Sequence, residues 1–418
     1  MTRRSSFHVR DCASAIVVLW VLGCVVTALN PFAWAQAAEI HLTVSFRAAE
    51  DEDFYREVLD RFEAENPGVT LEILPNMSPT RLLVAIAGGL SPDIANVDWG
   101  AFYRFVRAGV VLPLDRYMEE TKWGRALSTK MTPQALAQSS VLGHQYGIPL
   151  AAGANVPVYN PVLFASRGLG APPEQWTWDE VAEIARRLTD PVNGIYGLAD
   201  VTNNVIWEPL YDSHGGSWWN ETQTRFTFAS PPGLRTLEQI QDLAVLRQVS
   251  NPGNASKEFI AGRTGIAMAN TSWPRELDQA EAPWDFAPTP MGDVRQSIRG
   301  GNHPIMIMAS TRHPDLAWRV IETLTGDEAQ LAIANRGLRL PANLSVVPRI
   351  EDPVFRRYAE YLVYQMAPPT KFFNEIYEII QDHIGKMVAQ QLSPQAAVEE
   401  IQRLGEALVS EMDAQDRR

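Results

Sequence analysis

The sequence predicts an α/β fold of two lobes, each built from a sheet flanked by helices. In the N-terminal part of the chain, stretches of alternating apolar residues alternate with stretches of helical period. Such alternation is typical of a parallel sheet that helices cover on both faces. The 418 residues suffice for two domains, yet no linker-like or low-complexity stretch separates consecutive ones. We therefore expect two lobes that the chain crosses more than once.

The first elements follow from local patterns. Apolar residues alternate over 40–46 and again over 69–73, which predicts two strands. Residues 50–65 carry apolar side chains on one helical face and stop before a Pro-Gly pair, which predicts a helix between them. The same rules predict a helix from Ser78-Pro79 to Gly88-Gly89, a strand over 93–97 and a helix over 99–108.

After residue 110 the alternation of strand-like and helix-like stretches weakens, and the remaining elements are predicted from individual sequence motifs. Thr177, with Glu180 three residues later, predicts a capping box on a helix that ends at Leu188. Residues 207–228 are dense in aromatics. The remaining expected elements are strands within 144–150 and around 266–268, and helices over 234–248, 314–324, 328–334 and 374–412, the last broken near Ser393.

Residues 1–37 have the layout of a secretory signal peptide. Three arginines precede an apolar run from Ala13 to Leu29, and Ala-x-Ala sites end at Ala35 and Ala37. We expect cleavage, and a location in the periplasm or outside the cell. Two alternatives stay open: the run is long enough for an uncleaved anchor, and Cys24 ends a loose match to a lipoprotein signal.

Charge and cysteine content exclude several classes of partner and site. The formal charge is −13, and it becomes −15 without the first 37 residues, which hold three Arg and one Asp. An acidic body repels nucleic acid and anionic membranes, so we expect neither as a partner. Both cysteines lie in the leader and the histidines are scattered, so the sequence predicts no disulfide, no metal site and no cofactor.

Tryptophan is the most informative residue type. Several of the 12 stand at the ends of expected elements, each beside a polar residue: Asp98 precedes Trp99, Glu208 follows Trp207, and Asn270 lies shortly before Trp273. A flat indole gives a sugar ring a rigid apolar platform, and carboxylate, amide and guanidinium groups pair with its hydroxyls. Core packing is the alternative for any single Trp; the set predicts a sugar-binding cleft.

Four stretches carry a resemblance to a known family, the extracellular solute-binding proteins of bacterial ABC importers, in the class that takes up sugars. They are DIANVDWGAFYRFVRAGVVLPLDRYM, YGIPLAAGANVPVYNPVLFASRGLGAPPEQWTWDEV, EFIAGRTGIAMANTSW and GGNHPIMIMASTRHPDLAWRVIETLTGDEAQ. Each resembles the family loosely, but their order and spacing are specific. With the N-terminal strand and helix they cover nearly all of the mature chain.

The resemblance implies the two-lobed, type II-like periplasmic-binding-protein fold, with the ligand in a cleft that closes by hinge motion. Lobe one would comprise residues 38–152 and 295–336, and lobe two residues 153–294 and 337–418. The function implied is capture of a small carbohydrate by a monomer, without chemistry on it, and its delivery to the permease subunits of an ABC importer. A binding protein that presents its closed form to a sensory receptor would show the same sequence features, so this role is an alternative to transport.

The family pattern also places ligand groups at loops that face the cleft. Carried over to this sequence, they are Arg47, Glu50, Asp98, Trp99, Asn155, Trp207, Asn270, Trp273, Gly301, Asn302, Arg339 and Phe373. One departure matters, because many sugar binders have an aromatic residue at the end of the first strand, where this chain has Ser45 followed by Phe46 and Arg47. An acidic sugar or sugar phosphate is therefore an alternative to a neutral sugar.

An exported glycoside hydrolase is the alternative from another functional class. It would share the aromatic cleft but would need two carboxylates about 5 to 10 Å apart across the scissile bond. Asp98 and Glu208 are candidates for this pair.

Overall fold

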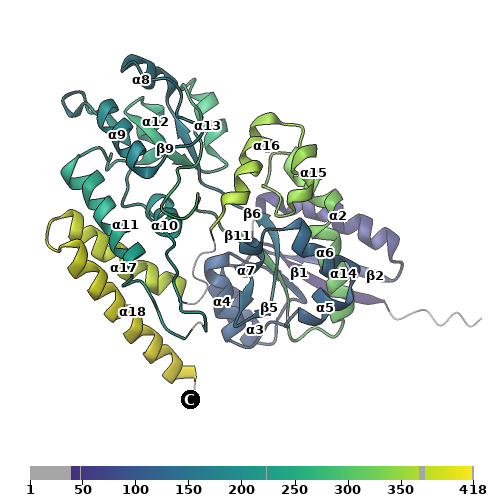
Figure 1. The fold of residues 1–418 in the computed structure, drawn as a ribbon. Coiled ribbons are helices and arrows are strands. Elements are labelled where there is room, and N and C mark those ends of the chain that lie inside the picture. The colour runs from purple at the N-terminus through teal and green to yellow at the C-terminus, as the bar shows by residue number, and fades with distance from the viewer. Residues whose placement is uncertain (1–38, 48, 223, 367–371, 417–418) are drawn as a thin grey trace, which may run out of the picture.

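The computed structural model describes residues 39–416 apart from 48, 223 and 367–371, and shows two α/β lobes side by side (Figure 1). The expected signal peptide lies outside the described residues. Each lobe is organised around its own sheet, one of five strands and one of four. The two-lobed α/β fold expected from the sequence is confirmed.

Lobe one combines the N-terminal elements with a later return of the chain. Its sheet has the order β2-β1-β3-β11-β6. The elements are β1 Ile40–Ser45, η1 Ala49–Asp51, α2 Glu52–Glu65, β2 Val69–Leu74, α3 Pro79–Ala87, β3 Ile94–Asn96, α4 Trp99–Arg107, α5 Asp115–Glu120, α6 Lys122–Lys130, α7 Pro133–Ala137, β4 Ser140–Val141, β5 His144–Gln145, β6 Ile148–Ala152, β11 Asn302–Ile307, α14 Pro314–Thr325, α15 Asp327–Asn335 and η4 Leu344–Arg349.

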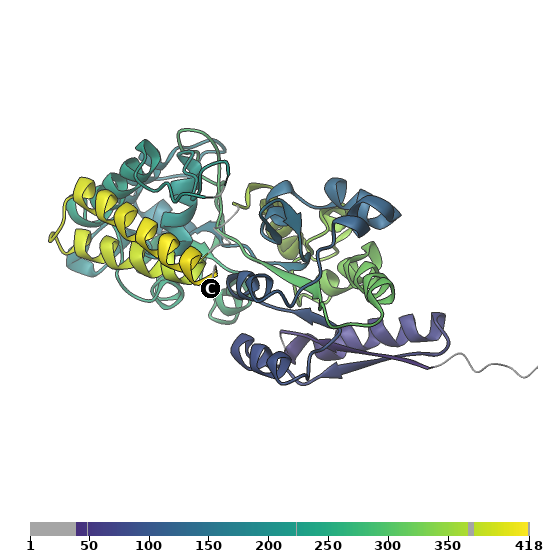
Figure 2. The same cartoon turned by 90° about the horizontal axis from the view of Figure 1, so that it is seen from below.

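Lobe two has a sheet of order β10-β7-β9-β8. The elements are β7 Val156–Tyr159, α8 Pro161–Ser166, α9 Trp178–Leu188, η2 Pro191–Asn193, β8 Tyr196–Leu198, α10 Asn204–Ser213, α11 Pro231–Gln241, a π-helical turn η3 Asp242–Leu246, α12 Ala255–Ile260, β9 Thr264–Ala269, α13 Trp273–Gln279, β10 Asp285–Phe286, α17 Phe373–Val388 and α18 Pro394–Asp416. Helix α16 Pro353–Glu360 and η5 Tyr361–Tyr364 lie between the lobes. The hairpin of α17 and α18 covers the outer side of lobe two (Figure 2).

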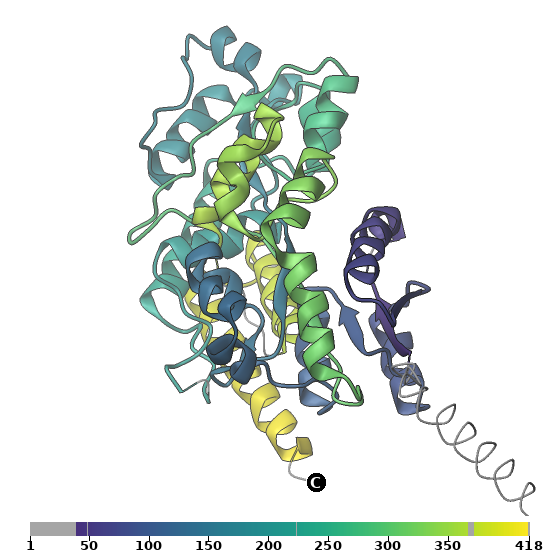
Figure 3. The ribbon, with the colours of Figure 1, turned by 90° about the vertical axis from the view of Figure 1, so that its right-hand side faces the viewer.

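Apolar side chains pack on both faces of the lobe-one sheet. Helices α2 and α14 pack side by side on one face (Figure 3), over a core that includes Phe54, Phe62 and Trp318. On the other face, Phe102 and Phe105 of α4 pack with Met306 of β11. The expected covering of both faces is therefore present.

The sheets are mixed, which corrects the expected parallel sheet. In lobe one, β1, β2 and β3 are parallel, whereas β11 runs antiparallel to β3 and to β6. In lobe two, β8 and β9 are parallel, whereas β7 runs antiparallel to β9 and β10. The reversed strand of each sheet is thus the one by which the chain enters that lobe from the other.

This reversal defines the edge of each sheet that faces the other lobe. Strand β6 ends where the chain leaves lobe one, and β7 starts at the near edge of lobe two. The strands parallel to β6 therefore all point their carboxyl ends toward lobe two, and β8 and β9 point theirs toward lobe one. Ligands of open α/β sheets bind outside the carboxyl ends of the strands, so these two edges are where a site is expected.

Backbone hydrogen bonds join the crossing segments to one another. Asn155 N donates to Arg299 O at 2.8 Å, Gly153 N to Gly301 O at 2.8 Å, and Met366 N to Ile298 O at 3.0 Å. Three stretches that are far apart in sequence thus run together between the lobes. The expected division into lobes at 152/153, 294/295 and 336/337 stays a proposal. That division would assign η4 to lobe two, whereas η4 contacts lobe one through Lys130 Nζ, which donates to Ser345 Oγ at 3.3 Å.

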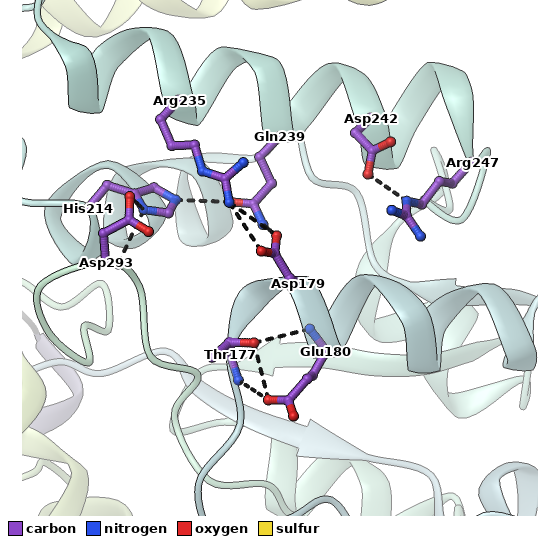
Figure 4. A network of polar contacts seen from close by, with 9 residues as sticks. All are labelled: Thr177, Asp179, Glu180, His214, Arg235, Gln239, Asp242, Arg247 and Asp293. Carbon is purple, nitrogen blue, oxygen red and sulfur yellow. Dashed lines mark hydrogen bonds and ion pairs between the residues drawn. The ribbon is translucent and has the colours of Figure 1, made fainter.

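A polar network fastens the loop before the second crossing to lobe two (Figure 4). His214 Nδ1 lies 2.8 Å from Asp293 Oδ2, and its Nε2 lies 2.9 Å from Gln239 Oε1. Gln239 Nε2 in turn donates to Asp179 Oδ1 at 3.2 Å. The loop that contains Asp293 is therefore attached to lobe two through residues of α9 and α11 and through His214 at the end of α10.

Candidate functional site

Polar side chains follow three neighbouring parallel strands of lobe one. Arg47 follows β1, Asn76 follows β2 and Asp98 follows β3, and all three line one pocket of about 330 Å³. Its other lining residues are Met77, Ser78, Pro79, Asn96 and Val97. Because the strands are adjacent and parallel, residues one or two places after each strand necessarily meet at this edge.

Arg47 and Asp98 form an ion pair with 3.4 Å between Nη2 and Oδ2. The two side chains are 34% and 40% exposed, so the pair is still open to solvent on one side. Asp98 is fixed as the N-cap of α4, since its Oδ1 accepts from Gly100 N at 2.9 Å. A partly exposed pair of this kind offers a polyhydroxylated ligand both a donor and an acceptor.

Two asparagines, which the sequence analysis missed, support the backbone around Arg47. Asn96 Oδ1 accepts from Arg47 N at 3.4 Å, and Asn76 Nδ2 donates to Arg47 O. Asn96 Nδ2 also donates to His303 O and Pro304 O, both at 3.0 Å, and so ties β3 to β11. Asn76 could have been predicted from the sequence, because it follows a strand in the same way as Arg47 and Asp98.

His303 lies on β11 near this edge and was also missed. Burial, and then the charge of Arg47, lower the pKa of its imidazole from 6.5 to about 4, whereas the charge of Asp98 opposes the shift. The imidazole is therefore neutral at neutral pH. Only the sheet order, which places β11 beside β3, brings this residue to the edge.

We expect His303 to make the fold sensitive to mild acid. Between pH 6.5 and about 4 the unfolded chain takes up a proton that the folded chain refuses, so stability is full above this window and is lost as pH falls through it. Urea unfolding at several pH values measures the slope. His303→Gln should flatten it, whereas the exposed His41→Gln should not; equal slopes in the parent and His303→Gln would contradict the assignment.

A larger cavity of about 830 Å³ lies between the lobes. Lobe one contributes Asp51 and Gly337–Arg339, lobe two contributes residues from Thr271 to Gln279, and the start of α16 closes one side. Arg339 Nε contacts Asp51 Oδ2 at 2.7 Å. Groups from both lobes therefore face one space, as an inter-lobe ligand requires.

Aromatic rings from both lobes form a row beside the crossing segments. Trp99 of lobe one contacts Phe373 edge-on at 4.2 Å between ring centroids. Phe373 stacks near Tyr377 at 5.9 Å, and Tyr377 near Trp207 at 6.1 Å. Trp99 is 8% and Trp207 1% exposed, and Trp207 Nε1 donates to Gln381 Oε1 at 3.2 Å. Four positions were expected to present rings to a ligand: Trp99, Trp207, Trp273 and Phe373. Of these, Trp99 and Trp207 are packed against protein.

Trp273 likewise does not offer its face as an open platform. It begins α13, is 6% exposed, and packs against Phe259 with 5.9 Å between ring centroids. Its neighbours Ser272 and Pro274 line the inter-lobe cavity, whereas Trp273 points into the core of lobe two. Asn270 is exposed, and its Oδ1 accepts from Ser272 N at 2.9 Å. In this structure Trp273 therefore packs in the core, and the ligand role expected for it stays a prediction.

The other expected site residues lie at the crossings. Asn155 Nδ2 donates to Arg299 O at 3.4 Å. Asn302 is fully buried and donates from its backbone N to Gln138 Oε1 at 2.8 Å, so it supports the crossing instead of facing a ligand. The backbone of Gly301 closely approaches the indole of Trp99, not an open space. Glu50 lies in η1, and its side chain is outside the described residues.

Within the described ranges, no group of three or more His, Cys, Asp or Glu is arranged to hold a metal ion. Over the same part of the chain, none of the helices combines the length and the apolar character needed to cross a bilayer.

Comparison with known families gives a match over most of the chain. The family described as bacterial extracellular solute-binding protein matches residues 48–331. A binding protein of Brucella abortus is 26% identical over 327 residues, which cover 74% of this chain and 77% of that protein. The maltotriose-binding protein of Pyrococcus abyssi is 26% identical over 58% of this chain and 53% of its own length. The mannitol-binding protein of Pseudomonas aeruginosa is 34% identical over 35% and 41%, respectively.

Solved structures share the fold at low identity. The sugar-binding protein MalE of Xanthomonas citri superposes with a TM-score of 0.79 at 18% identity, covering 90% of this chain and 99% of that one. The cyclic α-maltosyl-1,6-maltose binding protein of Arthrobacter globiformis superposes with a TM-score of 0.78 at 18% identity, covering 90% and 100%.

Proposed function

The chain belongs to the bacterial extracellular solute-binding protein family, a family of binding proteins and not of enzymes, and on this premise we propose that it captures a small neutral carbohydrate between its lobes. In this proposal the closed protein delivers the carbohydrate to the permease subunits of an ABC importer. Residues 1–37 direct export, and the protein acts in the periplasm or outside the cell.

The observation that carries the proposal is the meeting of Arg47, Asn76 and Asp98 at the carboxyl ends of three parallel strands. Guanidinium, amide and carboxylate groups are the planar partners that sugar hydroxyls take. Relatives named for maltotriose and mannitol binding support a polyhydroxylated ligand. The inter-lobe cavity of about 830 Å³ is within the range of small-molecule sites.

Charge balance supports a neutral ligand over an acidic one. Each arginine at the lobe-one edge already has a carboxylate: Arg47 has Asp98 at 3.4 Å, and Arg339 has Asp51 at 2.7 Å. An acidic sugar would have to displace one of these carboxylates or lie beside it. A neutral polyol can bridge a pair without breaking it.

The two carboxylates expected for the hydrolase alternative, Asp98 and Glu208, are not both accessible. Glu208 is buried and bonded to Arg299 Nε at 3.0 Å, and burial raises the pKa of its carboxyl. Asp98 is held by Arg47 and caps α4. Together with membership of a solute-binding family, this argues against hydrolysis.

A thermal-shift panel tests the proposal. Neutral sugars, sugar alcohols, uronic acids and sugar phosphates are added singly to the mature protein, since a ligand at 100 times its Kd stabilises the fold by about 2.7 kcal/mol. We expect a shift with a neutral member, and at least a tenfold loss of its affinity, about 1.4 kcal/mol, in Arg47→Met. Arg116→Met, which removes an ion pair between α5 and α14, is the control. Shifts confined to acidic members would replace the neutral ligand by a charged one.

A further inference from the structure

Trp99 of lobe one is enclosed by groups that do not belong to the lobe-one helices around it. Its ring contacts Phe373 of α17 edge-on at 4.2 Å. A Cβ added to Gly301, in the second crossing segment, would overlap the Nε1 edge of the indole. The guanidinium carbon of Arg299, from the same segment, lies 5.6 Å from the ring centroid, over its face. The ring is consequently only 8% exposed.

Arg299 is itself anchored in lobe two. Its Nε donates to Glu208 Oε2 of α10 at 3.0 Å, and the Glu208 side chain is 1% exposed. Its backbone oxygen accepts from Asn155 N of the first crossing segment at 2.8 Å. The guanidinium therefore has a fixed position relative to lobe two, while its face covers a ring of lobe one.

We propose that Arg299 is a positioning residue that links Trp99 of lobe one to Glu208 of lobe two and thereby fixes the relative orientation of the lobes. Arg299 acts through these two residues and does not contact the ligand. A guanidinium over an indole in a largely desolvated place is a favourable contact, and the buried carboxylate holds that guanidinium in one direction.

The effect on ligand affinity rests on the proposed function; the effect on lobe orientation does not. If the link is lost, the lobes sample more orientations, and only a fraction of the molecules is competent to bind. The apparent Kd rises as that fraction falls. A fall to about one third would weaken binding about threefold.

Distance measurement between spin labels on the two lobes tests the link without any ligand. Residues 38–418, the expected mature chain, contain no cysteine. In a protein of this span, Ser128→Cys on α6 and Glu238→Cys on α11 introduce the only two labels, both at exposed positions. The double variant Glu208→Met with Arg299→Met removes the buried pair without leaving one charge unpaired, a replacement that proteins often tolerate. We expect a distance distribution about twofold broader than in the parent.

Matched variants separate positioning from general damage. Arg295→Met removes a neighbouring contact from the same loop to the same helix, Arg295 to Asp212 at 3.9 Å, and should leave the distribution unchanged. Arg299→Lys keeps a cation near Glu208 and should restore most of the parent width. If the double variant does not fold, Glu208→Gln takes its place, with an intermediate broadening expected. A parent-like width in the double variant, or in Glu208→Gln, overturns the proposal even if a carbohydrate binds.

Discussion

Replacing Trp273 by alanine is expected to destabilise the ligand-free protein by about 3 to 5 kcal/mol, the usual cost of removing a buried Trp. The indole is 6% exposed and lies in the core of lobe two against Phe259. Alanine there would leave a cavity lined by apolar groups that do not collapse into it. Urea unfolding of the ligand-free protein measures the loss.

Trp284→Ala is the matched control for this prediction. Trp284 is only partly buried, and its Nε1 donates to Asp278 Oδ1 at the surface at 3.0 Å. Its removal should cost less than half as much as that of Trp273. Near-normal stability of Trp273→Ala combined with a large loss of ligand affinity would contradict the packing role. It would support the ligand-stacking role that the sequence predicts for Trp273.

Gly301→Ala is the second substitution for which we expect a large effect. The new Cβ would overlap atoms of the Trp99 indole, which has no free space because Arg299 and Phe373 hold its other sides. Forcing an extra carbon into a packed site typically costs about 1 to 3 kcal/mol. Here the strain falls on a crossing segment, so we expect weakened ligand binding as well as lower stability.

A double-mutant cycle with Trp99→Leu locates the clash. If the overlap with Trp99 is the cause, the added cost of Gly301→Ala should largely disappear in the Trp99→Leu background. Gly385→Ala in α17 serves as the control glycine, because a Cβ there meets nothing within 4 Å and helix propensity favours alanine. An equal cost of Gly301→Ala in both backgrounds would show that Trp99 is not the obstacle.

Local patterns were sufficient for the strongly periodic helices and for the first three strands, whereas short helices such as α5 to α8 and the strands β7, β8 and β11 were not predicted. The capping box expected at Thr177 and Glu180 forms, with Thr177 N donating to Glu180 Oε2 at 2.7 Å. Phe54, Val58 and Phe62 face the core from α2 as their spacing required. These features depend on contacts between residues three or four apart, so the sequence specifies them wherever the segment lies.

The candidate site was predictable only in part. Arg47 and Asp98 were recognisable because each follows a strand, and adjacency of β1 and β3 brings them together. His303 and Arg299 were not recognisable from the sequence. His303 lies on β11 beside β3, and Arg299 contacts Asn155 of the first crossing segment, and each partner is more than 140 residues away in the chain. No local pattern reports a partner that far away in the chain.

The sequence by itself determined the two-lobed α/β class, the strongly periodic helices such as α2 and α9, and the strand-end residues Arg47 and Asp98. Only the tertiary structure decided the direction of β7 and β11, because direction depends on which edge the chain crosses to. It also decided which tryptophans are covered: Trp273 begins α13 and Trp207 lies within α10, and along the chain neither position distinguishes an open cleft from a packed core. Whether an indole ring is accessible to a ligand depends on segments such as α12 and α17, which pack against Trp273 and Trp207, respectively. Such contacts between distant segments are determined by the whole fold.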